Sequence, residues 1–210
     1  GYLELTPLKG LSFRSQVSAT LSNSRQGLYW GAQCNANRPT YAGSPHAEKK
    51  HNEGYSYLWE NILNYKITVA KDHDFGATFI TSWQKNQNET TLAGGSGQDM
   101  DKWLYNRLMS AGQLHVESDF LQTQKMSYAF RFNYAYKGKY LLNISNRWDG
   151  VSWFSDGHKW DSFFATALAW RISDEKFMEG TRSWLDNLKL RVGYGVTGNS
   201  GGVGAYSTTT

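Results

Sequence analysis

The chain has 210 residues, with 22 lysines and arginines against 18 aspartates and glutamates, which gives a formal net charge of +4. Hydrophobic residues make up 40% of it, and no run approaches the roughly 20 apolar residues of a spanning helix, which excludes a helical membrane protein. The single Cys34 excludes an internal disulfide framework and a multi-cysteine zinc cluster. The basic residues do not cluster, so we expect no nucleic-acid partner.

Alternation of apolar and polar residues with period two predicts strands along most of the chain. It is strictest in residues 127–136 (SYAFRFNYAY), where every second residue is aromatic. Residues 140–149 repeat it after only Lys137, Gly138 and Lys139, which predicts a hairpin. We expect about eight strands, many of about 10–13 residues. In chain order they are 2–6, 11–21, 55–70, 75–85, 127–136, 140–149, 160–172 and 188–197.

The predicted connections alternate between short and long. The short ones are 7–10, 71–74 and 137–139, and the long ones are 23–54, 86–125 and 150–159. Residues 173–185 are an exception, because they are long and lie on the short side. Short turns at one end and long polar loops at the other are typical of an up-and-down outer-membrane barrel. A soluble β-sandwich also has alternating strands, so the pattern alone leaves both architectures open.

In a barrel, the aromatic side of residues 127–136 would face lipid. The opposite register would place Arg131 and Asn133 there, and an arginine at the bilayer midplane costs about 2–4 kcal/mol. The other faces carry a polar set suited to a wet lumen, or to the solvated outside of a sandwich. Its members are Arg14, Gln16, Lys66, Asn143, Arg147, Lys189 and Arg191.

Four segments resemble, in order and spacing, the SusC/RagA-like TonB-dependent outer-membrane transporters of Bacteroidetes. They are 127–142 (SYAFRFNYAYKGKYLL), 147–154 (RWDGVSWF), 167–178 (ALAWRISDEKFM) and 188–199 (LKLRVGYGVTGN). Residues 2–15 (YLELTPLKGLSFRS) also resemble a barrel hairpin of this family. The chain departs from the family pattern RxDGSSRF at Val151 and Trp153.

The resemblance implies a barrel of about 22 strands with an N-terminal plug, located in the bacterial outer membrane and energised by the TonB complex. It also implies import of oligosaccharides or peptides with a SusD-like surface lipoprotein, and no catalysis. Residues 1–210 show about eight strands and no plug-like or TonB-contacting segment. We therefore expect them to be an internal segment of the barrel domain, with the plug and the remaining strands outside it. The alternative is a soluble, Trp-rich β-sandwich that binds carbohydrate.

Aromatic residues in the predicted long loops are the candidate ligand-binding residues, because flat aromatic faces stack on sugar rings. They are Tyr29, Trp30, Trp103 and Trp153. Packing between loops is the other interpretation of the same residues. Residues 99–111 (DMDKWLYNRLMSA) are predicted to form a short amphipathic helix.

Other tryptophans lie near the predicted strand ends, where we expect them to form aromatic girdles at the membrane interfaces. These are Trp83, Trp148, Trp160 and Trp170.

No catalytic, metal or cofactor site is expected. The histidines fall in predicted loops and one turn, without paired spacing, at His46, His51, His73, His115 and His158. The carboxylates Asp99, Asp101, Glu117 and Asp119 lie in a long polar loop, where solvated charge is the simpler interpretation. Gly193, Gly195 and Gly198 spell GxGxxG without a helix pattern after them, so we expect no nucleotide cofactor.

Overall fold

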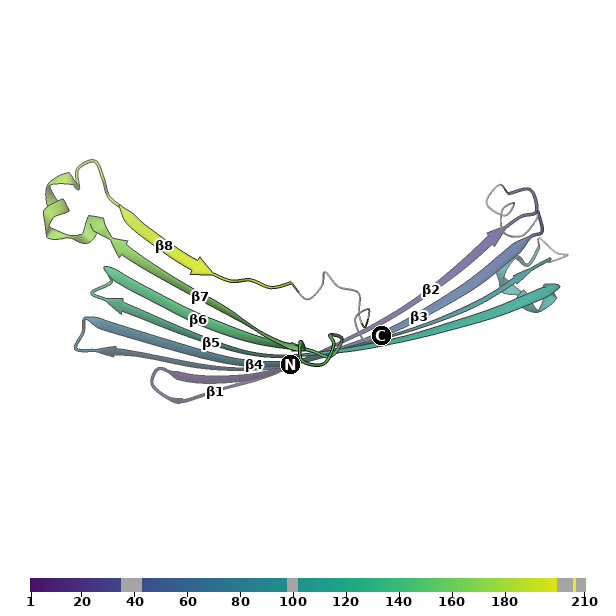
Figure 1. Ribbon diagram of the computed structural model, residues 1–210, viewed down its shortest axis with the longest axis horizontal. Helices are drawn as coiled ribbons and strands as arrows, with labels where there is room; N and C mark the ends of the chain where they lie inside the picture. The colour runs from purple at the N-terminus through teal and green to yellow at the C-terminus, as the bar shows by residue number, and fades with distance from the viewer. Residues whose placement is uncertain (35–42, 98–101, 200–205, 207–210) are drawn as a thin grey trace. The chain divides into compact units, whose positions relative to one another are not determined.

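The computed structural model describes residues 1–34, 43–97, 102–199 and 206. Its eight strands form one antiparallel sheet in chain order, each strand paired with the next (Figure 1). The strands are β1 Tyr2–Leu8, β2 Leu11–Trp30, β3 His46–Val69, β4 His73–Ser96, β5 Gln113–Tyr136, β6 Tyr140–Val151, β7 Trp160–Arg171 and β8 Lys189–Gly195. The predicted up-and-down order of eight strands is confirmed. The described residues form no second sheet, so they do not form the two-layer sandwich that the pattern had left open.

The strands are longer than predicted. β2 has 20 residues, and β3, β4 and β5 have 24 each. The prediction that residues 23–54 and 86–125 are long loops was therefore wrong over much of their length. Segments such as residues 46–53 (HAEKKHNE) are polar on both faces and so lack alternation, yet backbone pairing still makes them strands.

Three tight turns join the strands at one end of the sheet. In the β5–β6 turn, Lys137 and Gly138 both have positive φ, of 52° and 66°. The Lys139 amide donates to the Tyr136 carbonyl at 2.9 Å, so with two positive φ values this is a type I′ turn, and the predicted hairpin is confirmed. In the β1–β2 turn, Gly10 has φ of +84°, and a Cβ there would lie 2.1 Å from the Lys66 carbonyl oxygen. Only glycine fits this position.

The longer connections contain short 3₁₀ helices. Residues between β7 and β8 form η3 Ile172–Asp174 and η4 Lys176–Thr181, and those between β4 and β5 include η1 Leu104–Asn106 and η2 Leu108–Ser110. The predicted amphipathic helix over 99–111 is therefore wrong for residues 102–111, which contain these two short helices. Residues 99–101 lie outside the described residues. In the described ranges, no helix is long and apolar enough to cross a membrane.

Contacts group the chain into two units, which are described separately. The first unit comprises residues 1–18, 58–84 and 123–210, and the second comprises 19–57 and 85–122. The first unit contains β1, β6, β7 and β8 with the turn-side halves of β2 to β5, and the second contains the other halves. Among described residues, Ala47 and Val151 are the only buried hydrophobic ones. Neither unit therefore has a closed apolar core.

Candidate functional site

The two faces of the sheet in the first unit differ sharply in chemistry. The register pairs Tyr134 with Leu142 and Asn133 with Asn143, and successive residues alternate between faces. One face, here called the apolar face, carries no charged residue in β5 to β8. Its members are Met126, Tyr128, Phe130, Phe132, Tyr134, Tyr136, Tyr140, Leu142, Ile144, Asn146, Trp148, Gly150, Trp160, Ser162, Phe164, Thr166, Leu168, Trp170, Leu190, Val192 and Tyr194.

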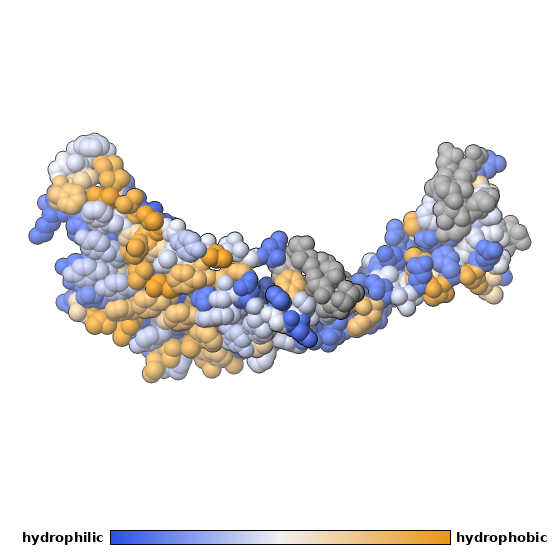
Figure 2. All heavy atoms as spheres, viewed as in Figure 1, coloured by the Kyte–Doolittle hydropathy of each residue, from blue (hydrophilic) through white to orange (hydrophobic). Residues whose placement is uncertain are grey.

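The apolar face is open rather than packed. Leu168 is 60% exposed and Val192 is 65% exposed. Figure 2 shows hydrophobic side chains gathered on the part of the first unit around β6 to β8. A contiguous exposed apolar surface of this kind requires a partner or a lipid environment.

The opposite face, here called the polar face, carries the charges. Asp149 lies 2.7 Å from Arg147 Nε and 3.2 Å from Lys125 Nζ, and Arg147 also donates to Ser127 Oγ at 3.2 Å. The Asn143 amide donates to Asn133 on the neighbouring strand. The predicted alternation of faces over residues 127–149 is therefore confirmed.

Aromatic residues lie at both ends of the apolar face. At the turn end, the Tyr140 ring stacks on Tyr136 and on Trp170, with centroids 6.2 and 6.3 Å apart. At the other end, Tyr128 stacks on Trp160 at 6.0 Å, and Trp148 pairs directly with Tyr128.

These two aromatic groups are here called the turn-end belt (Tyr136, Tyr140 and Trp170) and the Tyr128 belt (Tyr128, Trp148 and Trp160). The distance between them suits a membrane. Trp160 and Trp170 are the first and eleventh residues of β7, which places them about 33 Å apart along the strand. At the strand tilt of about 40° found in membrane barrels, this is a rise of about 25 Å, the usual height of the lipid-facing band. Three of the four tryptophans predicted for girdles thus lie at the ends of the apolar face.

A carboxylate beyond the end of β7 fixes the turn-end belt. Glu175 accepts hydrogen bonds from Tyr140 Oη at 2.7 Å and Trp170 Nε1 at 3.1 Å, and from Lys139 Nζ at 3.2 Å. Donation to the ionised carboxylate, chiefly from Tyr140 and then Trp170, lowers the pKa of Glu175 below its ordinary value.

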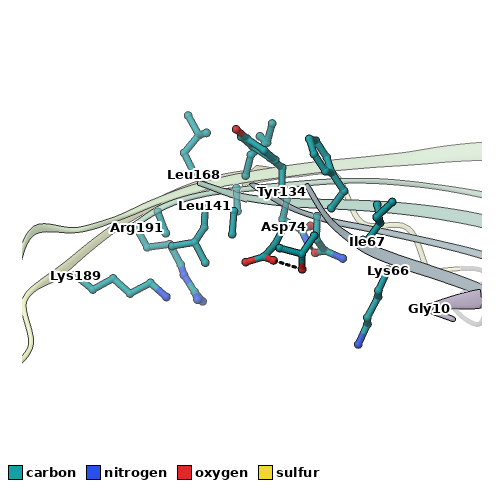
Figure 3. Close-up of a pocket in the computed structure, with 18 of the residues that line it drawn as sticks. Gly10, Lys66, Ile67, Asp74, Tyr134, Leu141, Leu168, Lys189 and Arg191 are labelled. Atoms are coloured by element: carbon teal, nitrogen blue, oxygen red, sulfur yellow. Dashed lines mark hydrogen bonds between the residues drawn. The ribbon is translucent and has the colours of Figure 1, made fainter. Parts of the chain in front are cut away.

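A hollow of about 1280 Å³ lies against the first unit near the turn end. Figure 3 shows Lys66, Lys189 and Arg191 on one side of the strands, with Leu168, Tyr134 and Ile67 projecting to the other. Lys9 also lines the hollow. The one carboxylate in its lining is Asp74, which accepts from Thr68 Oγ1 at 2.7 Å. The excess of cations favours anionic groups at this place.

The candidate ligand-binding aromatics lie partly in a strand and partly in the connections between strands. Tyr29 and Trp30 are the last residues of β2 rather than loop residues, and Trp30 stacks on His46 with centroids 5.4 Å apart. Trp103 precedes η1, is 39% exposed, and has the Arg107 guanidinium 5.6 Å from its ring. Trp153, in the first unit, lies edge-on to Phe154 at 6.1 Å.

The histidines are also placed differently from the prediction. His46 and His51 lie in β3 and His115 lies in β5, not in loops. The sheet brings His46 and His115 together, with nearly parallel rings and centroids 5.7 Å apart. The available signal was the His46-x-Glu48 spacing, which puts both side chains on one face of a strand. It was missed because this segment was assigned to a loop.

Comparisons with known proteins agree with the sheet. No family model matches the chain. It is 31% identical over 201 residues to TonB-dependent receptor P26 of Formosa agariphila, covering 94% of this chain and 20% of that protein. It is 42% identical over 139 residues to TonB-dependent receptor SusC of Bacteroides thetaiotaomicron, covering 65% of this chain and 14% of that protein.

Solved structures show the same fold. The RagAB peptide transporter superposes with a TM-score of 0.84 at 23% identity, covering 98% of this chain and 22% of that one. The open-open state of the RagAB peptide importer gives 0.83 with the same coverage. This chain therefore spans about a fifth of the length of these proteins. It is a homologue of the SusC/RagA-like TonB-dependent receptors, and its eight-stranded sheet has the fold of a stretch of their β-barrel.

Proposed function

We propose that residues 1–210 form part of the barrel wall of a TonB-dependent nutrient importer in the bacterial outer membrane. The observation that carries this proposal is the uncharged apolar face of β5 to β8, bounded by two aromatic belts. A face without charge and about 25 Å high suits lipid, and the charged opposite face suits a wet lumen. The chain is then a segment of the barrel domain, and the plug and the other strands belong to the rest of the protein.

The proposed cargo is an oligosaccharide or a peptide. The homology to SusC and the likeness to the RagAB peptide transporter support this range. The cations of the hollow favour cargo with carboxylates. The proposed partners are a SusD-like lipoprotein at the cell surface and the TonB complex, which would engage parts of the protein outside these residues.

The proposed ligand contacts remain Tyr29, Trp30, Trp103 and Trp153. Trp103 is substantially exposed, and the Lys102 and Arg107 cations over its ring would favour cargo that also carries anionic groups. Trp30 has part of its ring surface covered by His46, so it offers less area to a sugar.

Thiol labelling tests the membrane assignment. In the full-length protein with its native cysteines replaced, Leu168→Cys and Ala167→Cys place a thiol on opposite faces of β7 at one depth. In intact outer membranes, Leu168→Cys should react with a lipid-soluble maleimide and Ala167→Cys with a small polar one. Equal reaction of both with the polar reagent would contradict a lipid-facing apolar face.

Uptake tests the transport assignment. Cells that lack the gene should lose uptake of one labelled class, either short peptides or oligosaccharides, and recover it with the full-length gene. Loss of uptake in cells without TonB is also expected. Recovery without TonB would exclude TonB-dependent transport, even if the labelling result stands.

A further inference from the structure

Three side chains in the second unit form a compact set of metal-type donors. His46 and Glu48 extend from β3, and His115 extends from β5. One donor atom from each lies within 4.8 Å of the other two. His46 Nε2 and Glu48 Oε1 are 2.7 Å apart. In the described part of the chain, this is the one group of three or more such residues that is close enough to hold an ion.

Gly94 of β4 creates the space in which the two histidines meet. A Cβ on Gly94 would lie 2.1 Å from His115 Cε1 and 2.4 Å from His115 Nε2, so the imidazole occupies the place of a side chain. The ring of His115 can therefore lie over Gly94 and reach His46. A glycine in a strand interior is otherwise unfavourable, and close approach of another group is its usual reason.

The surroundings hold the set in place on one side and leave it open on the other. His46 is fully buried, and the Trp30 ring stacks on it with an interplanar angle of 25°. The Glu48 side chain is 20% exposed, and His115 is also partly exposed. An ion can thus enter past Glu48 and His115, while His46 supplies a fixed ligand.

We propose that His46, Glu48 and His115 bind a divalent transition-metal ion of the zinc type. Two imidazoles and one carboxylate are a common zinc ligand set, whereas calcium and magnesium prefer oxygen ligands alone. At a metal–ligand distance of about 2.0–2.1 Å, donors of a tetrahedral site lie about 3.3 Å apart. Small side-chain rotations reach this from the present spacing. The ion ties β3 to β5 across β4 and keeps a fourth position for water or for a donor group of cargo.

The same strand provides a matched control. His51 and Glu53 repeat the His-x-Glu spacing five residues further along β3, with the two side chains 3.5 Å apart. The Nε2 atom of His51 also lies 3.2 Å from Asn23 Oδ1 on β2. Replacing His51 removes an equivalent imidazole from the same strand without touching the three proposed ligands.

Metal binding is measured on the full-length protein in detergent, purified without a histidine tag and stripped with a chelator. Zinc content after gel filtration and the visible absorption of added Co²⁺ are compared for wild type, His46→Gln, His115→Gln, Glu48→Gln and His51→Gln. We expect each ligand variant to weaken binding at this site by at least about tenfold, as substitutions near metal sites do. The His46→Gln/His115→Gln protein should bind one equivalent less than wild type, and His51→Gln should match wild type.

Zinc should also raise the melting temperature of wild type and of His51→Gln, but less that of His115→Gln, because an ion bound only to the folded state stabilises it. Membrane assembly of each variant, measured in the same cells, shows that it folds. Glu48→Gln keeps the shape of the side chain, so it separates loss of the ligand from loss of packing. Zinc content and cobalt spectra that are the same in wild type and the double variant would overturn the proposal.

Discussion

The strands of the sheet show different side-chain patterns in the two units of the molecule. In the first unit, residues 127–136 of β5 alternate strictly, with aromatic residues on one face and Arg131 and Asn133 on the other. In the second unit, residues 46–53 of β3 (HAEKKHNE) have polar groups on both faces. Both regions are strands of one sheet. Alternation therefore records the difference between the media on the two sides of a sheet, not the presence of a strand.

Where both faces of the sheet are polar, side-chain hydrogen bonds between strands add to the backbone pairing. Asn52 of β3 donates to Ser24 Oγ of β2 at 3.1 Å and accepts from Thr90 Oγ1 of β4 at 2.8 Å. This ladder links three strands without apolar burial. On the apolar face of the first unit, stacked rings such as Tyr140 and Trp170 join neighbouring strands instead. The two regions thus use polar and apolar cross-strand pairs for the same task.

Arginine on the apolar face is the strongest test of this difference. Phe132 lies midway between the Tyr128 and Tyr136 rows, so Phe132→Arg places a charge at the centre of the proposed lipid-facing band. We expect it to destabilise the folded barrel by about 2–4 kcal/mol. The measurement is urea unfolding of the full-length protein in lipid, together with its amount in the outer membrane.

The matched control is Ala165→Arg, which lies on the polar face opposite Ser145 at similar depth. It should cost much less than Phe132→Arg, because the charge stays in water. An equal loss of unfolding free energy in both variants would show that the two faces of the sheet lie in the same environment.

The sequence predicts the first unit better than the second for this same reason. The turn at Lys137–Lys139 follows from a short polar break between two alternating runs, and the structure confirms it. Tyr29 and Trp30 were assigned to a loop because the polar residues before them, 22–26 (SNSRQ), show no period. Strand pairing there depends on residues of β3, such as His46 beside Trp30, which lie 16 or more residues away and outside any local pattern. The His46 and His115 contact depends on that pairing and on Gly94 between them.

Acidification should loosen the turn-end belt of the first unit. The pKa of Glu175 is lowered in the folded state by donation from Tyr140 and Trp170. A lowered pKa stabilises the fold above the unfolded pKa of about 4.3, and this contribution is lost as pH falls through the folded value. Between pH 5 and 3, wild type should therefore lose melting temperature more steeply than Glu175→Gln. Glu179→Gln removes the same charge from the same segment and should follow wild type, and a slope unchanged in Glu175→Gln would count against the hydrogen-bonded carboxylate.

In the second unit, loss of one ladder residue should have a smaller and local effect. Asn52→Ala removes the side-chain bonds to Ser24 and Thr90, which we expect to cost about 1 kcal/mol or less, because both partners can turn to water. Hydrogen exchange of β3 amides around residue 52 should quicken, while amides near residue 66 stay protected. Lys49→Ala, at an exposed position three residues away, is the control. Faster exchange along the whole of β3 would mean that these side-chain hydrogen bonds stabilise the entire strand and not only the residues around Asn52.

The smallest effect should come from the same substitution on the same strand, outside the apolar band. Phe120 lies in β5 twelve residues before Phe132, in the second unit, and is 57% exposed. Eight residues separate it from the Tyr128 belt, which is about 26 Å along the strand and well beyond the proposed lipid boundary. Phe120→Arg should therefore change the free energy of unfolding by no more than about 0.5 kcal/mol, as exposed surface substitutions do. A loss as large as that of Phe132→Arg would move the lipid boundary into the second unit, and the polar faces there would then need a protein partner rather than water.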